Sequence, residues 1–396
     1  MKKILFVIPT MRMGGAEQSL VSLLNSIDLN TYQVDLLLFE KNGELLERVP
    51  GKINLIEADT ITRAMTLEFR YFFKDLIKEH HYFTAAIRIF MLINSKLEEI
   101  TGKKNVFNWN IAKHFIRMLT KEYDVAVGYL EGVTDAFVID KVNAKRKIGW
   151  IHTNFEKANR HFKAEGEYYK QFNKIAIISD ECRNSFIKYY PDLSDKICVI
   201  ENIIDKNTIL SKAQENIEES LRWIYPCIVT VGRLEKVKGI DIALEVARVL
   251  KEEGIDFVWH VFGDGVLKAE LERKIDDYGL ESNFFINGTT RNPYKYMKNA
   301  DIIVQSSRNE GKSIVLDEAK VLCKPIVVTN YLSARDQIKD GETGLIVDMH
   351  PKAIAEGIIK LISSPEQRKY LEEQCKKESN NTELVMKKII SMIEGD

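Results

Sequence analysis

Short apolar runs alternate with amphipathic segments along most of the chain, and this alternation predicts the fold. The runs are rich in Val and Ile and apolar on successive residues, which is typical of parallel strands covered on both faces. They are Ile4–Pro9, Val34–Phe39, Val125–Leu130, Lys147–His152, Ile175–Ser179, Cys198–Glu201, Cys227–Gly232, Phe257–Gly263, Phe284–Gly288, Asp301–Ser306, Pro325–Thr329 and Gly344–Val347. Between these runs, apolar residues recur at helical spacing, as in Gly239–Leu250. We therefore expect an α/β protein with doubly wound sheets.

A polar stretch over residues 204–224 interrupts the alternation and predicts a domain boundary. We place a first Rossmann-like domain at 1–205 and a second at 206–382. Residues 383–396 are expected to form a helix that packs back toward the first domain. Open α/β sheets bind ligands at the carboxyl ends of their strands. Function is therefore expected in the loops at those ends, on two domains that face each other across a cleft.

Residues 60–122 break the rhythm with a mostly helical pattern that is rich in aromatic and basic side chains. Eleven basic residues stand against six acidic ones, an excess of five positive charges. Basic helices with aromatic faces can lie on an anionic membrane surface. The alternative is that the aromatic residues are core and the charges a solvated face. The aromatic residues are Phe69, Tyr71, Phe72, Phe73, Tyr82, Phe83, Phe90, Phe107, Trp109 and Phe115.

Composition narrows the picture further. The 396 residues suffice for two domains, and the net charge of −1 lacks the basic excess of a general nucleic-acid binder. The five cysteines are scattered, which favours a reducing compartment over a disulfide framework or a zinc site. The first apolar run is too short for a signal peptide. A cytoplasmic location is expected, with contact at the inner face of the cell membrane as an option.

The loop Thr10–Glu17 directly follows the first predicted strand and contains the pair Gly14 and Gly15. Paired glycines let the backbone approach a ligand, and a helix start offers free N–H groups to phosphate. The dinucleotide fingerprint G-x-G-x-x-G is absent. A plain strand-to-helix turn remains the alternative.

The loop Gly232–Gly239 follows the first strand of the second half and carries Arg233 and Lys238. Two cations beside a helix start can neutralise the charge that grows on a diphosphate leaving group. The alternative is a turn with two surface cations.

The segment Ser306–Ala319 holds two carboxylates, Glu310 in a predicted loop and Glu318 on a predicted helix that begins near Ser313. Eight residues at helical rise span about 12 Å, which resembles the separation of sugar and ribose in a nucleotide diphosphate sugar. Carboxylates accept hydrogen bonds from paired hydroxyls. The N–H groups from Lys312 to Ile314 are expected to hold phosphate or sugar oxygens. The alternative is two acids on a solvated helix.

Two further polar residues follow strands of the first half. His152 ends the run Lys147–His152, where its ring could hydrogen-bond a sugar or a leaving group. Glu131 follows the run Val125–Leu130 and is a candidate for acceptor binding. A structural role is the alternative for both.

Together these motifs resemble the GT-B glycosyltransferases, specifically glycosyltransferase family 4 (group 1), and the resemblance covers nearly the whole chain. Its most specific part is the pair Glu310 and Glu318, supported by the two loops above. The turn Phe262–Gly265 and the segments Glu201–Asp205 and Asp340–Val347 are also similar.

The resemblance implies retaining transfer of a sugar from a nucleotide diphosphate sugar, with a UDP-sugar as donor and no metal or other cofactor. The acceptor would be a saccharide or a lipid-linked saccharide, in capsule, exopolysaccharide or other cell-surface glycan synthesis. Arg233 and Lys238 would hold the diphosphate, Glu310 the sugar and Glu318 the ribose. A departing phosphate oxygen, rather than a protein carboxylate, would deprotonate the acceptor. The candidate residues are Glu310, His152, Arg233 and Lys238 for the reaction, and Gly14, Gly15, Glu131, Gly263, Thr289, Gly311, Lys312, Ser313, Ile314 and Glu318 for binding.

Two segments depart from the family pattern. Gly311-Lys312-Ser313 replaces the common Gly-Phe-Gly, and Tyr331–Ala334 occupies a region that often carries paired glycines. These departures bear on the identity of the donor sugar more than on the reaction. Two other functions stay open: a nucleotide-sugar epimerase of the same fold, and a non-catalytic partner of another glycosyltransferase.

Overall fold

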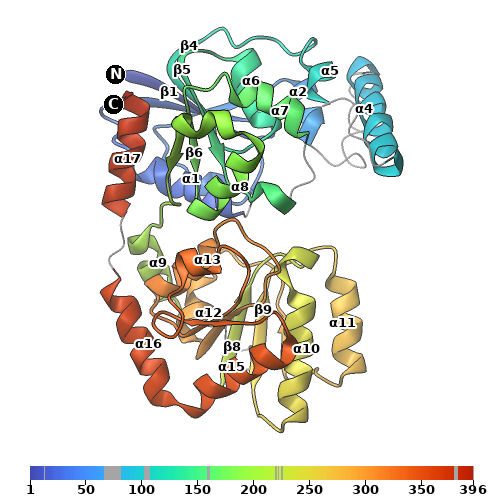
Figure 1. Ribbon diagram of the computed structural model, residues 1–396, viewed down its shortest axis with the longest axis vertical. Helices are drawn as coiled ribbons and strands as arrows, with labels where there is room; N and C mark the ends of the chain where they lie inside the picture. The colour runs from blue at the N-terminus through green and yellow to red at the C-terminus, as the bar shows by residue number, and fades with distance from the viewer. Residues whose placement is uncertain are drawn as a thin grey trace. The chain divides into compact units, whose positions relative to one another are not determined.

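The computed structural model describes residues 1–12, 14–66, 82–101, 108–157, 161–218, 221, 223, 226–378 and 382–395. The chain divides into two compact units (Figure 1). Unit 1 comprises Met1–Ile203 and Glu383–Asp396, and unit 2 comprises Ile204–Thr382. The sequence places the boundary at 205/206, within the same short connection.

Unit 1 is built on a seven-stranded sheet in which every pairing is parallel, with the order β3-β2-β1-β4-β5-β6-β7. Its strands are β1 (Lys2–Ile8), β2 (Tyr32–Leu38), β3 (Asn54–Glu57), β4 (Glu122–Gly128), β5 (Asn143–Ile151), β6 (Lys174–Ile177) and β7 (Ile197–Val199). The central strand β1 is apolar on successive residues because both faces of the sheet are covered, and Ile4 to Ile8 are fully buried.

The helices of unit 1 are α1 (Gly15–Ser26), α2 (Thr60–Thr66), α4 (Tyr82–Thr101), α5 (Trp109–Ala112), α6 (Val133–Lys141), α7 (Phe162–Tyr169), α8 (Asp180–Tyr189) and α17 (Thr382–Glu394). The described residues of unit 1 also form short 3-10 helices, namely η1 (Leu46–Arg48), η2 (Phe155–Lys157) and η3 (Pro191–Lys196). The sequence predicts a helix over residues 383–396 beside the first domain. In the structure, Val385, Ile389, Met392 and Ile393 of α17 are buried in the core of unit 1. The Glu394 carboxylate accepts hydrogen bonds from Lys2 (2.5 Å) and Tyr32 (2.8 Å).

The aromatic residues of the predicted insert divide between core and surface. Residues 67–81 and 102–107 lie outside the described residues, and with them Phe69, Tyr71, Phe72, Phe73 and Phe107. Trp109 is fully buried and donates its ring N–H to Asp140 at 2.7 Å. Phe83 and Phe90 of α4, in contrast, are 59% and 57% exposed. None of the described helices has both the length and the apolar content that a membrane span requires.

Unit 2 is built on a second all-parallel sheet, six-stranded, with the order β10-β9-β8-β11-β12-β13. Its strands are β8 (Cys227–Val231), β9 (Val258–Phe262), β10 (Phe284–Ile286), β11 (Ile302–Gln305), β12 (Ile326–Thr329) and β13 (Leu345–Val347). Its helices are α9 (Lys206–Lys212), η4 (Lys236–Lys238), α10 (Ile240–Glu252), α11 (Lys268–Asp277), α12 (Tyr294–Asn299), α13 (Ile314–Val321), α14 (Ala334–Gln337), α15 (Pro351–Ser363) and α16 (Pro365–Lys377).

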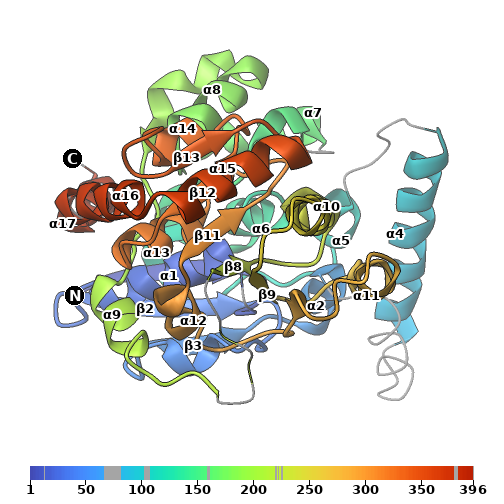
Figure 2. The same ribbon diagram turned by 90° about the horizontal axis from the view of Figure 1, so that it is seen from below.

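Helices cover both faces of this sheet because successive strand residues point to opposite sides. Ile228, Ile302 and Val327 pack in one apolar cluster with α10, α11 and α15. Their neighbours Val229, Ile303 and Ile326 pack in another cluster with α9, α12 and α13. Figure 2 shows α10 and α11 on one side of the sheet and α9, α12 and α13 on the other. The predicted α/β class with two doubly wound sheets is thereby confirmed.

Candidate functional site

The predicted donor residues gather in unit 2 at the carboxyl ends of neighbouring strands. Arg233 and Lys238 follow β8, Gly263 follows β9, Thr289 follows β10 and Glu310 follows β11. Because β10, β9, β8 and β11 are consecutive in a parallel sheet, these loops share one edge. This edge is where open α/β sheets bind ligands.

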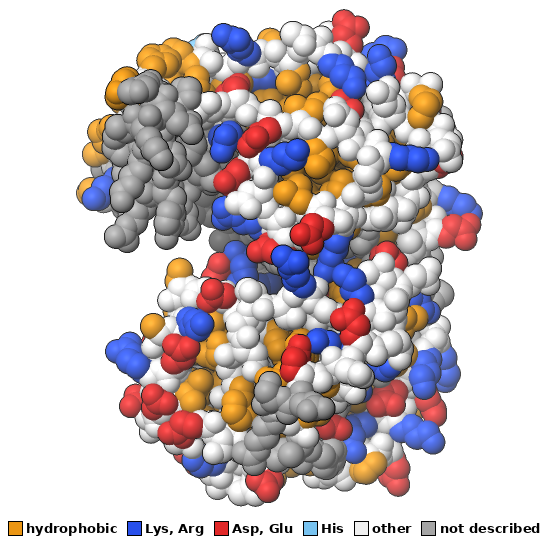
Figure 3. All heavy atoms as spheres, turned by 180° about the vertical axis from the view of Figure 1, so that it is seen from behind, with side chains coloured by type: hydrophobic (Ala, Val, Ile, Leu, Met, Phe, Trp, Pro, Cys, Tyr) orange, Lys and Arg blue, Asp and Glu red, His pale blue; other side chains and the backbone are white. Residues whose placement is uncertain are grey.

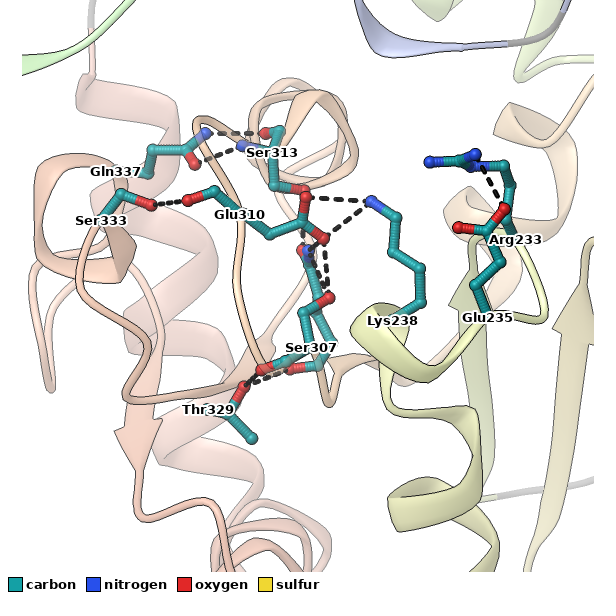
Figure 4. Close-up of polar contacts among 10 residues, drawn as sticks. Arg233, Glu235, Lys238, Ser307, Glu310, Ser313, Thr329, Ser333 and Gln337 are labelled. Carbon is teal, nitrogen blue, oxygen red and sulfur yellow. Dashed lines mark hydrogen bonds and ion pairs between the residues drawn. The ribbon is translucent and has the colours of Figure 1, made fainter. Parts of the chain in front are cut away.

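Lys238 and Glu310 form the centre of this edge. The Lys238 ammonium donates to both carboxylate oxygens of Glu310, at 2.7 and 2.9 Å (Figure 4). Their side chains are 24% and 11% exposed. The sequence places these residues in separate motifs, 72 positions apart, and the fold brings their charges into direct contact.

Gly239 makes this contact possible because it lets the two loops approach each other. Its φ of +66° favours glycine, and a Cβ there would lie 2.0 Å from the backbone oxygen of Ser306. The Ser306 hydroxyl donates to the Gly239 carbonyl at 2.8 Å. Arg308 adds a second link with a bidentate pair to Asp241, at 2.7 and 2.8 Å. Burial alone would raise the pKa of Asp241, but the hydrogen bonds from Arg308 and Lys236 lower it below its ordinary value.

Arg233 lies apart from the central pair. Its guanidinium is paired with Glu235 at 2.8 Å, and its side chain is 61% exposed. Figure 4 shows Arg233 beyond Lys238 as seen from Glu310. An exposed pair of this kind contributes little stability, so the guanidinium can exchange its partner at small cost.

The close packing of two loops within unit 2 explains why position 263 is a glycine. A Cβ at Gly263 would lie 1.9 Å from the Gly232 carbonyl oxygen, so only glycine fits between the two loops. The Gly263 N–H donates to the Gly288 carbonyl at 2.8 Å, which ties in the next loop as well. Thr289 follows Gly288 and is exposed.

The start of α13 differs from the expectation for its backbone N–H groups. The Ser313 N–H was expected to face phosphate or sugar oxygens, but it donates to the side chain of Gln337 at 2.7 Å. Ser313 and Ile314 are buried, while Gly311 and Lys312 are partly exposed. A side chain from α14 thus satisfies the Ser313 amide in this structure, and the contact of this amide with a ligand stays a prediction.

The segment that replaces the family's paired glycines also reaches Glu310. The Ser333 hydroxyl donates to the Glu310 carbonyl at 2.8 Å (Figure 4). Tyr331 is 3% exposed, and burial, followed by the charge of Glu310, raises its pKa well above the usual value. Its hydroxyl therefore stays protonated.

Glu318 is 3% exposed on α13 and accepts a hydrogen bond from the Tyr294 hydroxyl of α12 at 2.9 Å. The carboxylate predicted to hold a ribose is therefore already held on one side by a phenol. Tyr294 was not singled out in the sequence, because its partner lies 24 positions away on another helix.

In unit 1, Glu131 and His152 are brought together at the carboxyl ends of the adjacent strands β4 and β5. Glu131 accepts from the His152 backbone N–H at 2.9 Å and from the Thr153 hydroxyl at 2.7 Å. The His152 ring packs against Tyr129 and Trp150, with centroids 5.0 and 6.3 Å away.

The His152 ring is neutral at physiological pH. Burial lowers its pKa to about 4, although Glu131 and a hydrogen bond to the Tyr129 backbone act in the opposite direction. Its Nε2 is buried and has no hydrogen-bond partner in the described part of the chain. A neutral imidazole with an open nitrogen can accept a hydrogen bond from a hydroxyl.

Gly14 and Gly15 stand at the start of α1, after β1 of the same sheet. Gly14 is extended, and Gly15 begins the helix. The Glu17 carboxylate folds back over Gly14, where a Cβ would lie 2.1 Å from one of its oxygens. Among the residues that the structure describes, no group of three His, Cys, Asp or Glu side chains could hold a metal ion.

Residues 213–378 match the family described as Glycosyl transferases group 1. Poly(ribitol-phosphate) alpha-N-acetylglucosaminyltransferase of Staphylococcus aureus is 23% identical over 341 residues, which are 82% of this chain and 66% of that protein. N-acetylgalactosamine-N,N'-diacetylbacillosaminyl-diphospho-undecaprenol 4-alpha-N-acetylgalactosaminyltransferase of Campylobacter jejuni is 32% identical over 187 residues, or 46% and 49% of the two chains. The chain thus spans just under two thirds of the first relative and about half of the second.

Solved structures with similar folds cover the chain more fully. A mutant of Staphylococcus aureus TarM in complex with fondaparinux, alpha-GlcNAc-glycerol and UDP superposes with a TM-score of 0.70 at 16% identity, over 99% of this chain and 100% of that one. Anabaena HepE in complex with UDP gives a TM-score of 0.68 at 15% identity, over 100% of both chains. These identities show a shared fold. Residues 213–378 thus resemble the group 1 glycosyl transferases, and the two parallel sheets of the chain have the GT-B fold.

Proposed function

We propose that the protein transfers a sugar from a nucleotide diphosphate sugar to a saccharide acceptor. The observation that carries this proposal is the contact between Lys238 and Glu310 at the ligand-binding edge of the unit that matches the family. It supplies one cation for phosphate and one carboxylate for sugar hydroxyls within a single site. UDP is the donor nucleotide that we propose, because TarM and HepE were solved with UDP and HepE also with UDP-glucose.

The donor would exchange the partners of three charged groups. Lys238 and Arg233 would turn from Glu310 and Glu235 to the diphosphate, whose charge grows as the sugar–phosphate bond breaks. The released Glu310 carboxylate would accept hydrogen bonds from the sugar. Glu318, next to Tyr294, would accept from the ribose. These roles need no protein nucleophile, since a phosphate oxygen of the leaving group can take the acceptor proton.

The acceptor would bind unit 1. Glu131 and His152 occupy one edge of its sheet, and Nε2 of His152 is a ready acceptor for a hydroxyl. The paired glycines Gly14 and Gly15 lie at the end of β1, the strand next to β4 in the same sheet. Hydroxyl-rich ligands suit such a set of acceptors.

We also propose that transfer retains the anomeric configuration and requires no metal. The first proposal is supported by two relatives that are named as alpha transferases. The second rests on the cations of Arg233 and Lys238, which can neutralise a diphosphate. NMR of the product's anomeric proton tests retention, and an inverted product contradicts it. Turnover after treatment with EDTA tests metal independence, and a loss restored by a divalent cation contradicts it.

A binding screen followed by product analysis tests the function itself. Thermal shifts with UDP, GDP, ADP and their sugars should show stabilisation by one nucleotide class. Incubation of that donor with saccharide acceptors should then give a glycosylated product. An isomerised nucleotide sugar without transfer would instead identify an epimerase. A chain that binds none of these nucleotides, even by calorimetry, would be a non-catalytic partner.

We further propose that the saccharide acceptor is lipid-linked and that the protein contacts an anionic membrane surface. The Campylobacter relative is named for a diphospho-undecaprenol acceptor. In this chain, one face of α4 exposes Phe90, Ile93, Leu97 and Ile100, which are 48% to 74% exposed. Phe83 of α4 packs against the exposed ring of Phe115, with the two ring centroids 5.0 Å apart. Figure 3 shows apolar side chains gathered beside the grey residues at its left edge.

Charge favours an anionic lipid surface over a neutral partner for this face. Lys96 on α4 and Arg117 after α5 are exposed. Glu98, the one acid of α4 whose side chain is described, is 10% exposed and paired with His161. Exposed apolar side chains with cations nearby bind an anionic lipid surface through burial of apolar area and through electrostatic attraction.

Vesicle flotation tests the membrane contact. The wild type should float with vesicles that contain phosphatidylglycerol and not with pure phosphatidylcholine. The double variant Phe90→Ser with Ile93→Ser should stay unbound, while Leu384→Ser, which removes a 47% exposed leucine from α17, should float like the wild type. Wild type that fails to bind anionic vesicles, or a double variant that binds fully, rejects this proposal.

A further inference from the structure

Among the described residues, two side chains besides Lys238 donate to the Glu310 carboxylate. The Gln305 amide donates to one carboxylate oxygen at 3.0 Å, and the Ser307 hydroxyl donates to the same oxygen at 2.7 Å. In the proposed function Lys238 turns to the diphosphate, and these two donors then remain to fix the carboxylate. Gln305 and Ser307 are 6% and 1% exposed, so water competes poorly for them.

Gln305 is itself fixed from its other end. The Ser313 hydroxyl donates to the Gln305 amide oxygen at 2.8 Å. This contact turns the amide NH₂ of Gln305 toward Glu310, because a flipped amide would place its oxygen against the carboxylate. The orientation of one buried amide thus depends on a serine eight residues further along the chain.

Ser313 is in turn clamped by Gln337. The Ser313 N–H donates to the Gln337 amide oxygen and the Ser313 carbonyl accepts from the amide nitrogen, both at 2.7 Å (Figure 4). One side-chain amide therefore satisfies both backbone groups of Ser313, as a neighbouring strand would. This clamp lies in the segment Gly311-Lys312-Ser313, where the family pattern is Gly-Phe-Gly.

We propose that Gln337, Ser313 and Gln305 form a buried positioning chain that keeps the Glu310 carboxylate oriented toward the donor sugar while Lys238 contacts the diphosphate. The inference rests on the proposed function and adds Gln305 as a positioning residue that acts through Glu310. Buried networks of this kind specify one arrangement when every member is satisfied. Orientation matters because a small misplacement of a binding group at the reacting centre costs roughly 100-fold in rate.

The alternative is that the positioning chain only stabilises unit 2. Kinetic measurements distinguish a positioning role from a purely structural one. Gln305→Leu removes the side-chain hydrogen bonds of Gln305 to Glu310, Ser307 and Ser313 at similar volume. We expect kcat to fall roughly 10- to 100-fold, while the Kd for UDP changes less than about threefold because UDP lacks the sugar. The wild type should bind the UDP-sugar more tightly than UDP, and this preference should shrink in the variant.

Two further variants keep the test decisive. Thr343→Val removes a buried hydroxyl that accepts from the Lys339 N–H at the opposite edge of the sheet. It is the control for the loss of stability in Gln305→Leu, because Thr343 does not contact Glu310. It should lower the melting temperature comparably and leave kcat unchanged. Gln337→Leu should reduce kcat less than Gln305→Leu does, and the double variant should add little to the latter, since both break one chain.

The outcomes separate this inference from the function on which it rests. A wild type that binds nucleotide and transfers sugar, with Gln305→Leu at full kcat, overturns the positioning chain alone. The same holds if the losses of Gln305→Leu and Gln337→Leu multiply. A wild type that neither binds nor transfers from any nucleotide sugar overturns the proposed function, and the positioning chain with it.

Discussion

The Lys238 ammonium lies 2.7 and 2.9 Å from the two carboxylate oxygens of Glu310, so the two proposed donor-binding groups neutralise each other in this structure. A diphosphate that takes Lys238 must break this pair. The same event frees the carboxylate that is proposed to hold the sugar. Binding of the phosphate part and of the sugar part of the donor would therefore be coupled through one salt bridge.

Glu310→Gln should lower kcat by roughly 100-fold or more, because a neutral amide holds sugar hydroxyls less strongly than a carboxylate does. The affinity for UDP should stay equal or increase, since Lys238 no longer has a competing anion. Calorimetry with UDP and initial rates with the donor measure both effects. Glu235→Gln, which frees Arg233 instead, is the matched control and should leave kcat near the wild-type value. A Glu310→Gln enzyme at the wild-type rate would show that this role is wrong.

Gly239→Ala should destabilise unit 2 and weaken donor binding together. A Cβ at this position would lie 2.0 Å from the Ser306 carbonyl oxygen, in addition to the strain of φ +66°. Gly254→Ala is the control, because Gly254 has φ +71° with nothing near its Cβ, so it carries the backbone strain alone, about 1 kcal/mol. Urea unfolding should show at least about 2 kcal/mol more loss for Gly239→Ala. Equal losses in the two variants would mean that the loops do not need this close approach.

Glu318→Ala should weaken UDP binding by roughly tenfold or more, because it removes the proposed ribose acceptor. Tyr294→Phe deletes the hydroxyl that donates to Glu318 at 2.9 Å and should give a smaller loss of the same kind. Calorimetry with UDP and with inorganic diphosphate separates ribose binding from phosphate binding. If Glu318→Ala weakens both ligands equally, Glu318 does not hold the ribose.

Acid should destabilise unit 1 through His152. Its folded pKa of about 4 lies below the ordinary histidine pKa of 6.5, so the folded state stays neutral while the unfolded chain takes up a proton. The contribution of His152 to stability is full above pH 6.5 and falls as the pH drops toward 4, by about 2 kcal/mol at pH 5. His152→Gln should lack this part of the pH dependence. Urea unfolding of both proteins at pH 7.5 and pH 5 measures the difference, and identical slopes with pH would contradict the buried neutral ring.

Much of the fold follows from local pattern. Each of the twelve predicted apolar runs overlaps one observed strand, because strands buried on both faces must be apolar throughout. The exception is β3 (Asn54–Glu57), which was not predicted. It lies at the edge of the sheet with partly exposed residues, so its sequence carries no continuous apolar signal.

The site was less predictable, because its partners are chosen by tertiary contacts. The motifs indicated Lys238 and Glu310 singly, but their mutual contact depends on how closely two loops pack at Gly239. Arg308, Gln305 and Gln337 were missed because their partners stand 67, 5 and 24 positions away, with no recurring spacing. Arg233 shows the reverse case, since its partner Glu235 is two residues away and the predicted ligand contact stays a prediction.

Unit 1 is discontinuous in sequence, because α17 supplies Val385, Ile389, Met392 and Ile393 to a core that otherwise ends at Ile203. All of unit 2 is thus translated before the first unit has its last helix. A ribosome synthesises about 5–20 residues per second. While unit 2 is being synthesised, the apolar surface of unit 1 that later contacts α17 is therefore still uncovered. The core of unit 1 can therefore be completed only after all of unit 2 has been synthesised.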